Sequence, residues 1–251
     1  MLSRTRISIA SFVLLALIWP LAVTNAQSPG RHPISGREIA GVMGWQGAAW
    51  LERPERAAEE EPERALDAMG IEPGMTVADI GSGTGYFTVR LARRVGPGGR
   101  VYANDLQPEM QSLLRERLQR DSITNVTLVL GAIDDPRLPK ATLDLVLMVD
   151  VYHELSQSQA MLRRVSETLK PDGHLVLLEY RKEDPRIPIR PEHKMSVDEA
   201  RMEIEAEGYT LSRVDHRLPR QHVLYLRETR LDSAVTAPVL GAAGGYSSIP
   251  R

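Results

Sequence analysis

Residues 75–92 of this chain read MTVADIGSGTGYFTVRLA, and this stretch decides the fold. Its first part is apolar enough for a buried strand, and its last part has the pattern of an amphipathic helix. Gly81, Gly83 and Gly85 lie between the two, where residues without a Cβ let the backbone turn sharply and approach a ligand. The unpaired N–H groups at the start of the helix face the same point. A strand, a glycine turn and a helix in this order predict a nucleotide-binding site.

Two further residues narrow the choice of nucleotide. The dinucleotide-binding fingerprint G-x-G-x-x-G needs a glycine where this chain has Tyr86. Asp79 comes two residues before the first glycine, where a carboxylate repels a pyrophosphate and attracts a cation. A ligand with an ammonium, a sulfonium and a ribose, and without phosphate, therefore fits best. The alternative is a tight turn that binds nothing.

The pattern D-x-G-x-G-x-G at the end of a strand resembles motif I of the S-adenosylmethionine (SAM) methyltransferases with a Rossmann-like fold. The resemblance implies SAM as the cofactor and methyl transfer as the activity. It also implies a three-layer α/β fold, whose seven-stranded sheet has the order 3-2-1-4-5-7-6 with strand 7 antiparallel. The cofactor-binding residues expected in this motif are Asp79, Gly81, Ser82, Gly83, Gly85 and Tyr86.

The composition of the 251 residues argues against several other functions. An apolar content of 42% and a charged content of 25% are ordinary for a chain that buries a core. The net charge of −2, the lack of a basic stripe and the lack of an N/D-P-P-Y/F motif argue against a nucleic-acid partner. Cysteine is absent, which excludes disulfides, thiolate metal sites and a cysteine nucleophile.

The amino-terminal residues 1–26 have the pattern of a secretory signal peptide. Arg4 and Arg6 precede an apolar run over residues 7–23, and small residues up to Ala26 offer a cleavage site. No cysteine follows, so lipoprotein attachment is excluded. A short retained membrane anchor is the alternative. The sequence thus predicts an exported, periplasmic protein that contacts the membrane only through this segment, although SAM is made in the cytosol.

Four segments are expected after the signal peptide. The second of them, over residues 45–70, is expected to be helical and carries two tryptophans. A helical segment with one or two helices should break near Pro62 and close at Gly70. Its many charges predict a solvated face, and Trp45 and Trp50 are expected to close over the substrate. The four segments are a Gly/Ser/Pro-rich linker (27–44), the helical lid (45–70), the methyltransferase domain (71–230) and a disordered tail (231–251).

Apolar runs separated by turn residues predict the remaining strands and helices. The last two strands are joined by a loop too short for a crossover helix, so they should pair antiparallel. A capping box formed by Ser196 and Glu199 opens the last helix. Earlier helices are expected over residues 108–120 and 156–170. The strands are expected over residues 100–105, 126–130, 143–155, 174–180, 209–215 and 222–227.

Asp105 ends the second predicted strand, 20 residues beyond Gly85. In a doubly wound fold an acid at this position hydrogen-bonds the ribose hydroxyls of the ligand. An N-cap for the following helix is a compatible second role. Asp105 and its neighbour Leu106 therefore join the expected cofactor site.

A further acid is expected at the adenine end of the cofactor. Methyltransferases of the type resembled place an acid after the third strand to accept the adenine amino group. Asp134 or Asp135 fits this role, although many relatives carry the acid at the position of Ala132, and a turn before Pro136 is the alternative. Asp150, in the polar end of the fourth predicted strand, completes the expected cofactor contacts.

Three residues far apart in the sequence are the candidate catalytic group. His153 and Glu179 lie at the ends of two parallel strands, and the implied topology brings His222 to the same edge of the sheet. A histidine is the natural general base near neutral pH, and His153 is the first choice. His193 and Lys194, in the loop after the fifth strand, are expected close by.

The same polar strand ends raise the question of a metal. Metal-dependent O-methyltransferases use an acid after the fourth strand, which Asp150 matches, and an Asp-Asn pair after the fifth. This chain has Glu179 and Tyr180 at the second position, so no metal is expected.

Segments such as GAAWLERPER, VDVYHEL, EYRKEDPRIPI and LPRQH resemble a group of exported or uncharacterised bacterial methyltransferases. The resemblance runs over residues 36–227 and brings no substrate with it. The predicted function is therefore SAM-dependent methyl transfer to an unidentified small-molecule acceptor, with no oligomeric state predicted. A non-catalytic exported SAM-binding or scaffold protein with the same fold is the alternative.

Overall fold

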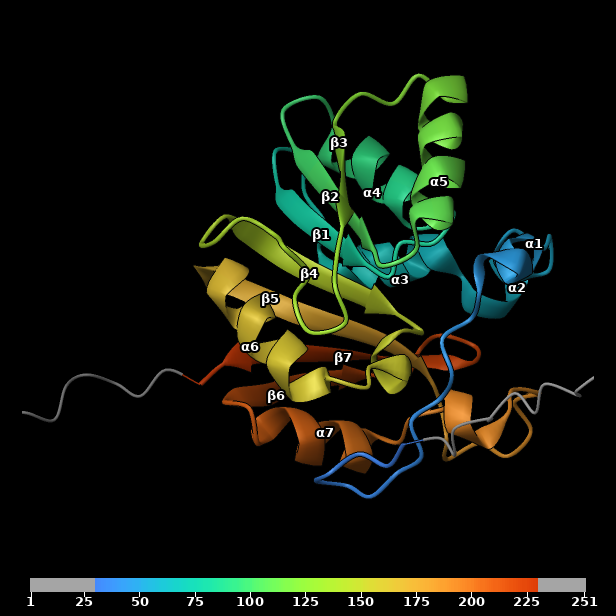
Figure 1. Ribbon diagram of the computed structural model, residues 1–251, viewed down its shortest axis with the longest axis vertical. Coiled ribbons are helices and arrows are strands. Elements are labelled where there is room, and N and C mark those ends of the chain that lie inside the picture. Colours follow the sequence, from blue (N-terminus) through green and yellow to red (C-terminus); the bar gives the residue numbers. More distant parts are fainter. Residues whose placement is uncertain (1–29, 230–251) are drawn as a thin grey trace, which may run out of the picture.

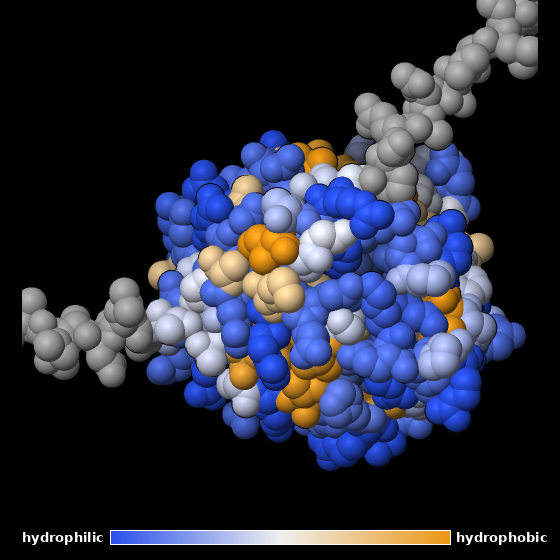
Figure 2. Space-filling model, turned by 90° about the horizontal axis from the view of Figure 1, so that it is seen from below, coloured by the Kyte–Doolittle hydropathy of each residue, from blue (hydrophilic) through white to orange (hydrophobic). Residues whose placement is uncertain are grey.

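The computed structural model describes residues 30–229. The predicted signal peptide, its cleavage site and the predicted tail over residues 231–251 lie outside these residues. Between residues 30 and 229, no helix has both the length and the apolar character needed to cross a bilayer. The face shown in Figure 2 is mostly hydrophilic, with hydrophobic residues in small separate groups.

Within residues 30–229, a seven-stranded sheet forms the centre of the fold (Figure 1). Its order is β3-β2-β1-β4-β5-β7-β6, as the sequence predicts. The first five strands are parallel, and β7 is antiparallel to both of its neighbours. The strands are β1 (Thr76–Ile80), β2 (Arg100–Asp105), β3 (Val126–Leu130), β4 (Leu143–Val149), β5 (Leu169–Tyr180), β6 (Tyr209–Asp215) and β7 (Gln221–Glu228).

Helices cover both faces of this sheet and make the fold three-layered. One face packs α3 (Pro62–Met69), α4 (Thr88–Val95) and α5 (Pro108–Arg120), and the other packs α6 (Ser158–Thr168) and α7 (Val197–Glu205). Alternate residues of β4 point to the two faces: Leu145 and Leu147 to the first, Val146 and Met148 to the second. The shorter elements are η1 (Trp45–Gly47), α1 (Ala48–Leu51), α2 (Arg56–Glu60), η2 (Tyr152–Glu154) and η3 (Pro191–His193).

Several local predictions from the sequence are confirmed. The capping box is present, with the Glu199 N–H donating to Ser196 Oγ at 3.1 Å and the Ser196 N–H donating to Glu199 Oε2 at 3.0 Å. Pro62 opens α3, and Gly70 ends it in the left-handed conformation at φ 68°. The lid is more finely divided than one or two helices, because η1, α1, α2 and α3 share it.

The predicted boundaries at the end of β4, the end of α6 and the start of β5 are wrong. The strand predicted over residues 143–155 ends at Val149, because Asp150 adopts a left-handed conformation with φ 53° and the chain then turns into η2. The helix predicted to run to residue 170 ends at Thr168, and β5 begins at Leu169 instead of residue 174. Leu169 pairs with Leu143 ahead of an irregularity in the ladder, so β5 includes the proline and glycine that predict a turn.

Residues 30–41, predicted to be a linker, are packed on the domain. The buried guanidinium of Arg37 meets Glu203 of α7, with 2.7 Å between Nε and Oε1. Its Nη1 donates to the carbonyl of His153 at 2.9 Å, and His32 lies 2.8 Å from Ser158 Oγ of α6. The segment therefore stabilises the turn that contains His153 by a hydrogen bond to its backbone.

Candidate active site

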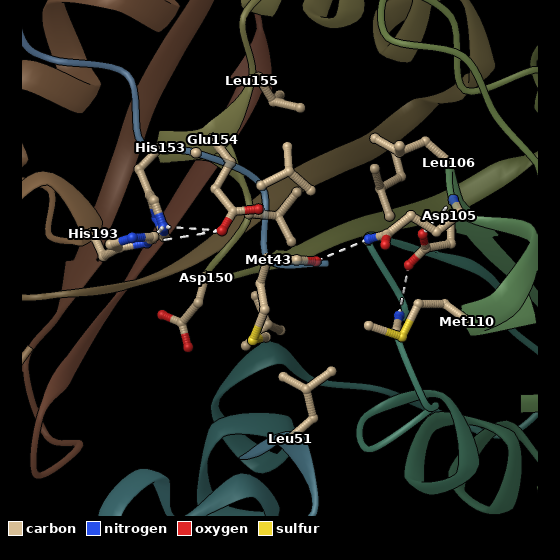
Figure 3. A pocket seen from close by; sticks show the side chains of 18 of the residues that line it. Met43, Leu51, Asp105, Leu106, Met110, Asp150, His153, Glu154, Leu155 and His193 are labelled. Carbon is tan, nitrogen blue, oxygen red and sulfur yellow. Dashed lines mark hydrogen bonds and ion pairs between the residues drawn. The ribbon is translucent and has the colours of Figure 1, made fainter. Parts of the chain in front are cut away.

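A cavity of about 750 Å³ opens at the carboxyl ends of β1, β2, β4 and β5, beneath the lid. Parallel strands of an open sheet place their ligand sites at this edge. Figure 3 shows two groups of side chains in the cavity, with Met43 and Asp150 between them. One group contains Asp105, Leu106 and Met110, and the other contains His153, Glu154 and His193.

The first group has the geometry of a ribose site. Asp105 Oδ2 accepts the N–H of Gly83 at 2.9 Å, and Oδ1 accepts the N–H of Gln107 at 2.9 Å. A carboxylate offers about four acceptor positions, so these backbone donors leave at least one position for a ribose hydroxyl. Burial raises the pKa of Asp105, while the backbone N–H groups of Gln107, Gly83 and Leu106 oppose this shift. Leu106, 46% exposed, lies beside it at the cavity wall.

The glycine turn serves packing as well as ligand access. Gly81 and Gly83 line the cavity, whereas Ser82, Gly85 and Tyr86 do not. Gly85 has φ 86°, and a Cβ there would lie 2.2 Å from Leu114 Cδ1 of α5. The glycine at this position therefore lets α5 pack against the turn. Cofactor contact by Ser82, Gly85 and Tyr86 stays a prediction.

Asp79 does not line the cavity. Its carboxylate is buried and accepts a hydrogen bond from Thr88 Oγ1 at 2.6 Å, at the start of α4. Burial raises the pKa of Asp79 to about 7 despite this bond. In this structure the motif acid holds the turn to its helix, and a direct contact with the SAM cation stays a prediction.

The two acids expected at the adenine also lie off the cavity wall. Ala132 and Ile133 line it, while Asp134 and Asp135 do not. Asp135 Oδ1 accepts the N–H of Arg137 at 2.7 Å. This bond spans the turn at Pro136, which is the alternative role predicted for these acids. Adenine contact by either acid remains a prediction.

Asp150 lines the middle of the cavity and has spare hydrogen-bonding capacity. Its Oδ2 accepts from Gln221 Nε2 at 2.8 Å, and its buried Oδ1 has no hydrogen-bond partner within residues 30–229. Burial first, and then the carboxylates of Glu60 and Glu179, raise its pKa well above the ordinary value. A cation bound beside Asp150 would favour its ionised form, so this acceptor oxygen fits the ammonium and sulfonium of SAM.

The structure brings His153 and Glu179 into direct contact at the other end. His153 Nδ1 lies 2.6 Å from Glu179 Oε2, and both side chains are buried. Burial acts to lower the pKa of His153, but the Glu179 carboxylate outweighs it and the pKa is raised. The protonated form of His153 is therefore stabilised inside the protein.

A chain of donors fixes the tautomers of the two histidines. Arg190 Nη2 lies 2.7 Å from His193 Nε2, and a guanidinium only donates, so Nε2 accepts. His193 Nδ1 then carries the proton and donates to His153 Nε2 at 3.2 Å. Burial lowers the pKa of His193, in keeping with a neutral ring. His153 therefore donates from Nδ1 to Glu179, and its Nε2 accepts the N–H of His193.

His222, the third candidate catalytic residue, is not brought to the cavity. Its backbone pairs with that of Glu179 across β5 and β7, but its side chain is fully buried away from the lining residues. Among the described residues, neither ring nitrogen has a hydrogen-bond partner, and burial lowers its pKa to about 4. A catalytic role for His222 stays a prediction that the geometry does not favour.

The lid contributes charged residues that the sequence analysis placed on a solvated face. Arg56 and Glu60 are buried and paired, with 2.8 Å between Nε and Oε2, and both line the cavity. Tyr180 at the end of β5 donates its hydroxyl to Glu60 Oε1 at 2.8 Å. The Arg53 guanidinium lies 3.9 Å from the ring centroid of Trp50. The i,i+4 spacing of Arg56 and Glu60 was the one sequence signal for this pair.

The side-chain amide of Gln107 connects the cofactor end to the start of the lid and to Met43, shortly before it in the chain. Gln107 Nε2 donates to the carbonyl of Met43 at 2.9 Å, and Gln107 Oε1 accepts the N–H of Trp45 at 2.8 Å. Trp50 lines the cavity but is 51% exposed, and Trp45 is 43% exposed and does not line it. Closure of both tryptophans over a substrate stays a prediction.

This fold and site define a SAM-dependent methyltransferase, and comparisons with known proteins agree. Residues 71–225 match the family described as Methyltransferase domain, and the chain belongs to this family. A solved SAM-dependent methyltransferase from Aquifex aeolicus is 29% identical with a TM-score of 0.70, covering 74% of this chain and 98% of that one. The match to a putative type 11 methyltransferase from Sulfolobus solfataricus, at 19% identity and a TM-score of 0.56, shows the fold alone.

The curated relatives align with a shorter part of this chain than the solved structures do. The ubiquinone/menaquinone biosynthesis C-methyltransferase UbiE of Hydrogenovibrio crunogenus is 34% identical over 119 residues, which are 47% of each chain. The UbiE of Pasteurella multocida is 32% identical over 118 residues, or 44% of its length. The chain thus aligns with about half the length of these relatives. The non-catalytic alternative gains no support from these matches.

Proposed function

We propose that the protein transfers the methyl group of SAM to a small, mostly apolar acceptor that carries an acidic hydroxyl group. The observation that carries the proposal is the His153–Glu179 pair, which presents a basic nitrogen to the same cavity that Asp105 enters. Apolar side chains line much of the cavity, among them Met43, Leu51, Leu155, Pro188 and Ile189. Such walls suit an apolar ring better than a charged polymer.

SAM supplies an electrophilic methyl carbon on a sulfonium, and the protein orients the acceptor and removes its proton. The acceptor hydroxyl replaces the N–H of His193 at His153 Nε2 and gives its proton to that nitrogen. The bond between the acceptor and the methyl group forms as the carbon–sulfur bond breaks, and the electron pair of that bond stays on sulfur. Glu179 stabilises the resulting imidazolium by charge and hydrogen bond.

A hydroxylated aromatic ring is the first acceptor class to test. Ionising a ring hydroxyl raises the electron density on that oxygen and on the adjacent ring carbon, so one base serves methylation at either atom. The UbiE relatives are named as C-methyltransferases of quinone biosynthesis, which supports this class by analogy.

The full chain should be assayed with SAM carrying a 13C-labelled methyl group against a panel of phenols, catechols and quinols. His153→Ala is expected to lower kcat/KM by roughly 10²–10⁴-fold, the usual contribution of a general base. Its Kd for SAM, measured by calorimetry, should stay within about threefold, because His153 lies at the acceptor end. His216→Ala removes an exposed histidine outside the cavity lining and is the matched control. Unaltered turnover in the His153 variant would sink the proposal.

We also propose that residues 1–26 direct export of the protein. The support is the sequence pattern of a basic start, an apolar run and small residues up to Ala26. Fusing residues 1–30 to a phosphatase that is active only outside the cytoplasm should give activity, and amino-terminal sequencing should locate the cleavage site. An inactive fusion would contradict export.

A further inference from the structure

Three side chains at the acceptor end of the cavity point their donor atoms at one spot. They are His153 and Glu154 of η2 and His193 of η3, and Figure 3 shows them converging. We propose that these three residues bind one divalent metal ion of the zinc class. The site departs from the expectation of no metal, which considered only the acids directly after the strands.

The distances between the donor atoms suit a metal with short bonds. His153 Nε2 lies 3.2 Å from His193 Nδ1, and Glu154 Oε1 lies 3.9 Å from the first nitrogen and 3.8 Å from the second. A tetrahedral zinc ion with bonds of about 2.0–2.1 Å separates its ligand atoms by roughly 3.3–3.5 Å. Movements of a few tenths of an ångström would bring the three atoms to these separations. Two histidines and one carboxylate are also a ligand set that zinc uses in enzymes.

The hydrogen bonds on the Nδ1 side of His153 are a second observation that supports a metal site. A metal-binding histidine usually donates its other ring N–H to a carboxylate, which fixes the ring and raises its basicity. Glu179 Oε2 takes this place, 2.6 Å from His153 Nδ1. Glu179 is itself held by the N–H of Tyr152, which donates to Oε1 at 3.0 Å. The Nε2 lone pair of His153 is therefore aimed at the proposed ion.

His193 must exchange one hydrogen bond to join the site. Its Nδ1 carries the proton in the metal-free structure, and Arg190 donates to its Nε2. With an ion on Nδ1 the proton moves to Nε2, and Arg190 has to turn away. The side chain of Arg190 is 74% exposed, so solvent can receive it. Apart from the small shifts of the three ligand atoms, binding therefore requires a change in one exposed side chain and none in the sheet.

The ion competes with the acceptor proton for one lone pair. Three protein ligands leave at least one coordination position of a zinc ion open, and here it faces the cavity. His153 Nε2 is the nitrogen that accepts the proton in the proposed function, so this consequence rests on that proposal. The zinc-bound protein is therefore the inhibited form of the enzyme.

Binding of the ion is tested on the full chain without any acceptor. Zn²⁺ calorimetry after chelator treatment should give one ion per chain, and Co²⁺ should give visible d–d bands of a low-coordinate nitrogen and oxygen site. His193→Ala and Glu154→Gln should each weaken Zn²⁺ binding by at least about tenfold, whereas His216→Ala should not change it. Circular dichroism confirms that each variant is folded. Absent binding, or equal binding in a variant lacking both His193 and Glu154, would overturn the site.

Inhibition is tested separately, with the acceptor found in the panel above. One equivalent of Zn²⁺ should suppress turnover, and a chelator should restore it. Faster turnover with Zn²⁺ would overturn the inhibitory assignment. If the protein binds Zn²⁺ at these residues while His153→Ala keeps full turnover, the proposed base is wrong and the metal site stands. If the base is verified and Zn²⁺ does not bind, only the metal site is wrong.

Discussion

Replacing Glu179 by glutamine removes the charge behind His153 while keeping the shape of the side chain. The carboxylate of Glu179 is fully buried and serves two donors, the Tyr152 N–H at 3.0 Å and His153 Nδ1 at 2.6 Å. A glutamine offers a single acceptor oxygen, so one of these donors loses its partner. The imidazolium form of His153 loses a negative neighbour in either case.

The size of the effect follows from the type of hydrogen bond that is lost. A hydrogen bond to a charged group contributes roughly 1.5–3 kcal/mol. The pKa of His153 should therefore fall by roughly one to two units, since one unit corresponds to 1.36 kcal/mol. If the same interaction stabilises the transition state for proton transfer, kcat/KM falls by about 10- to 150-fold.

The direction of the pH effect is set by the raised pKa of His153. A base must be neutral to act, so the acid limb of kcat/KM in the wild type should lie above the ordinary value of 6.5. In Glu179→Gln the burial of the ring remains and the carboxylate is gone, so this limb moves to lower pH. Because the pKa of His153 is higher in the folded than in the unfolded protein, its protonation stabilises the fold. This stabilisation is complete at pH values below the unfolded-state pKa, and it is lost as the pH rises through the folded-state pKa. The variant should therefore lose more stability at about pH 5.5 than at about pH 8.5.

The assay is a pH profile of kcat/KM combined with thermal unfolding at both pH values. Glu192→Gln, which removes an acid of η3 that pairs with Arg190, is the matched control and should leave the acid limb in place. A lower Tm for Glu179→Gln with an unmoved acid limb would mean that Glu179 is only structural. That result would refute the electrostatic reasoning.

Three further changes test the cofactor end and the packing around it. Asp105→Asn should weaken SAM binding by about 10- to 150-fold in calorimetry, because a charged acceptor is lost. Asp198→Asn, which changes an exposed acid outside the cavity lining, is the control and should alter binding less than about twofold; equal effects would contradict the ribose assignment. Gly85→Ala should lower Tm, because the left-handed conformation alone costs about 1–2 kcal/mol and the new Cβ also meets a leucine; an unchanged Tm would disprove the packing role. Arg37→Met should destabilise the fold by about 3–5 kcal/mol in denaturant unfolding, because it leaves Glu203 buried without its arginine. A loss below about 1 kcal/mol would show that residues 30–41 are only loosely held.

Local sequence patterns predicted the parts of the fold that local forces determine. The strands over residues 100–105, 126–130 and 209–215 have the predicted bounds, because each is an unbroken run of residues that suit a buried or half-buried strand. The end of β4 was missed because Asp150 turns left-handed, at φ 53°, after an apolar run that continues in the sequence. The start of β5 was missed because pairing of Leu169 with Leu143 extends a strand through residues that locally favour a turn.

The two ends of the cavity differ in how much of each is local in sequence. The cofactor end is one continuous motif plus the end of the next strand, so Gly83 and Asp105 were identified together although 22 positions separate them. The acceptor end joins the turn after β4, the end of β5, the loop before α7 and the lid. The contact between His153 and His193 spans 40 positions, and that between Tyr180 and Glu60 spans 120. Such contacts depend on the completed sheet, and the i,i+4 spacing of Arg56 and Glu60 predicts a pair without showing that it is buried. The methyl donor could therefore be inferred from the sequence, whereas the chemistry of the acceptor has to be inferred from side chains that only the fold brings together.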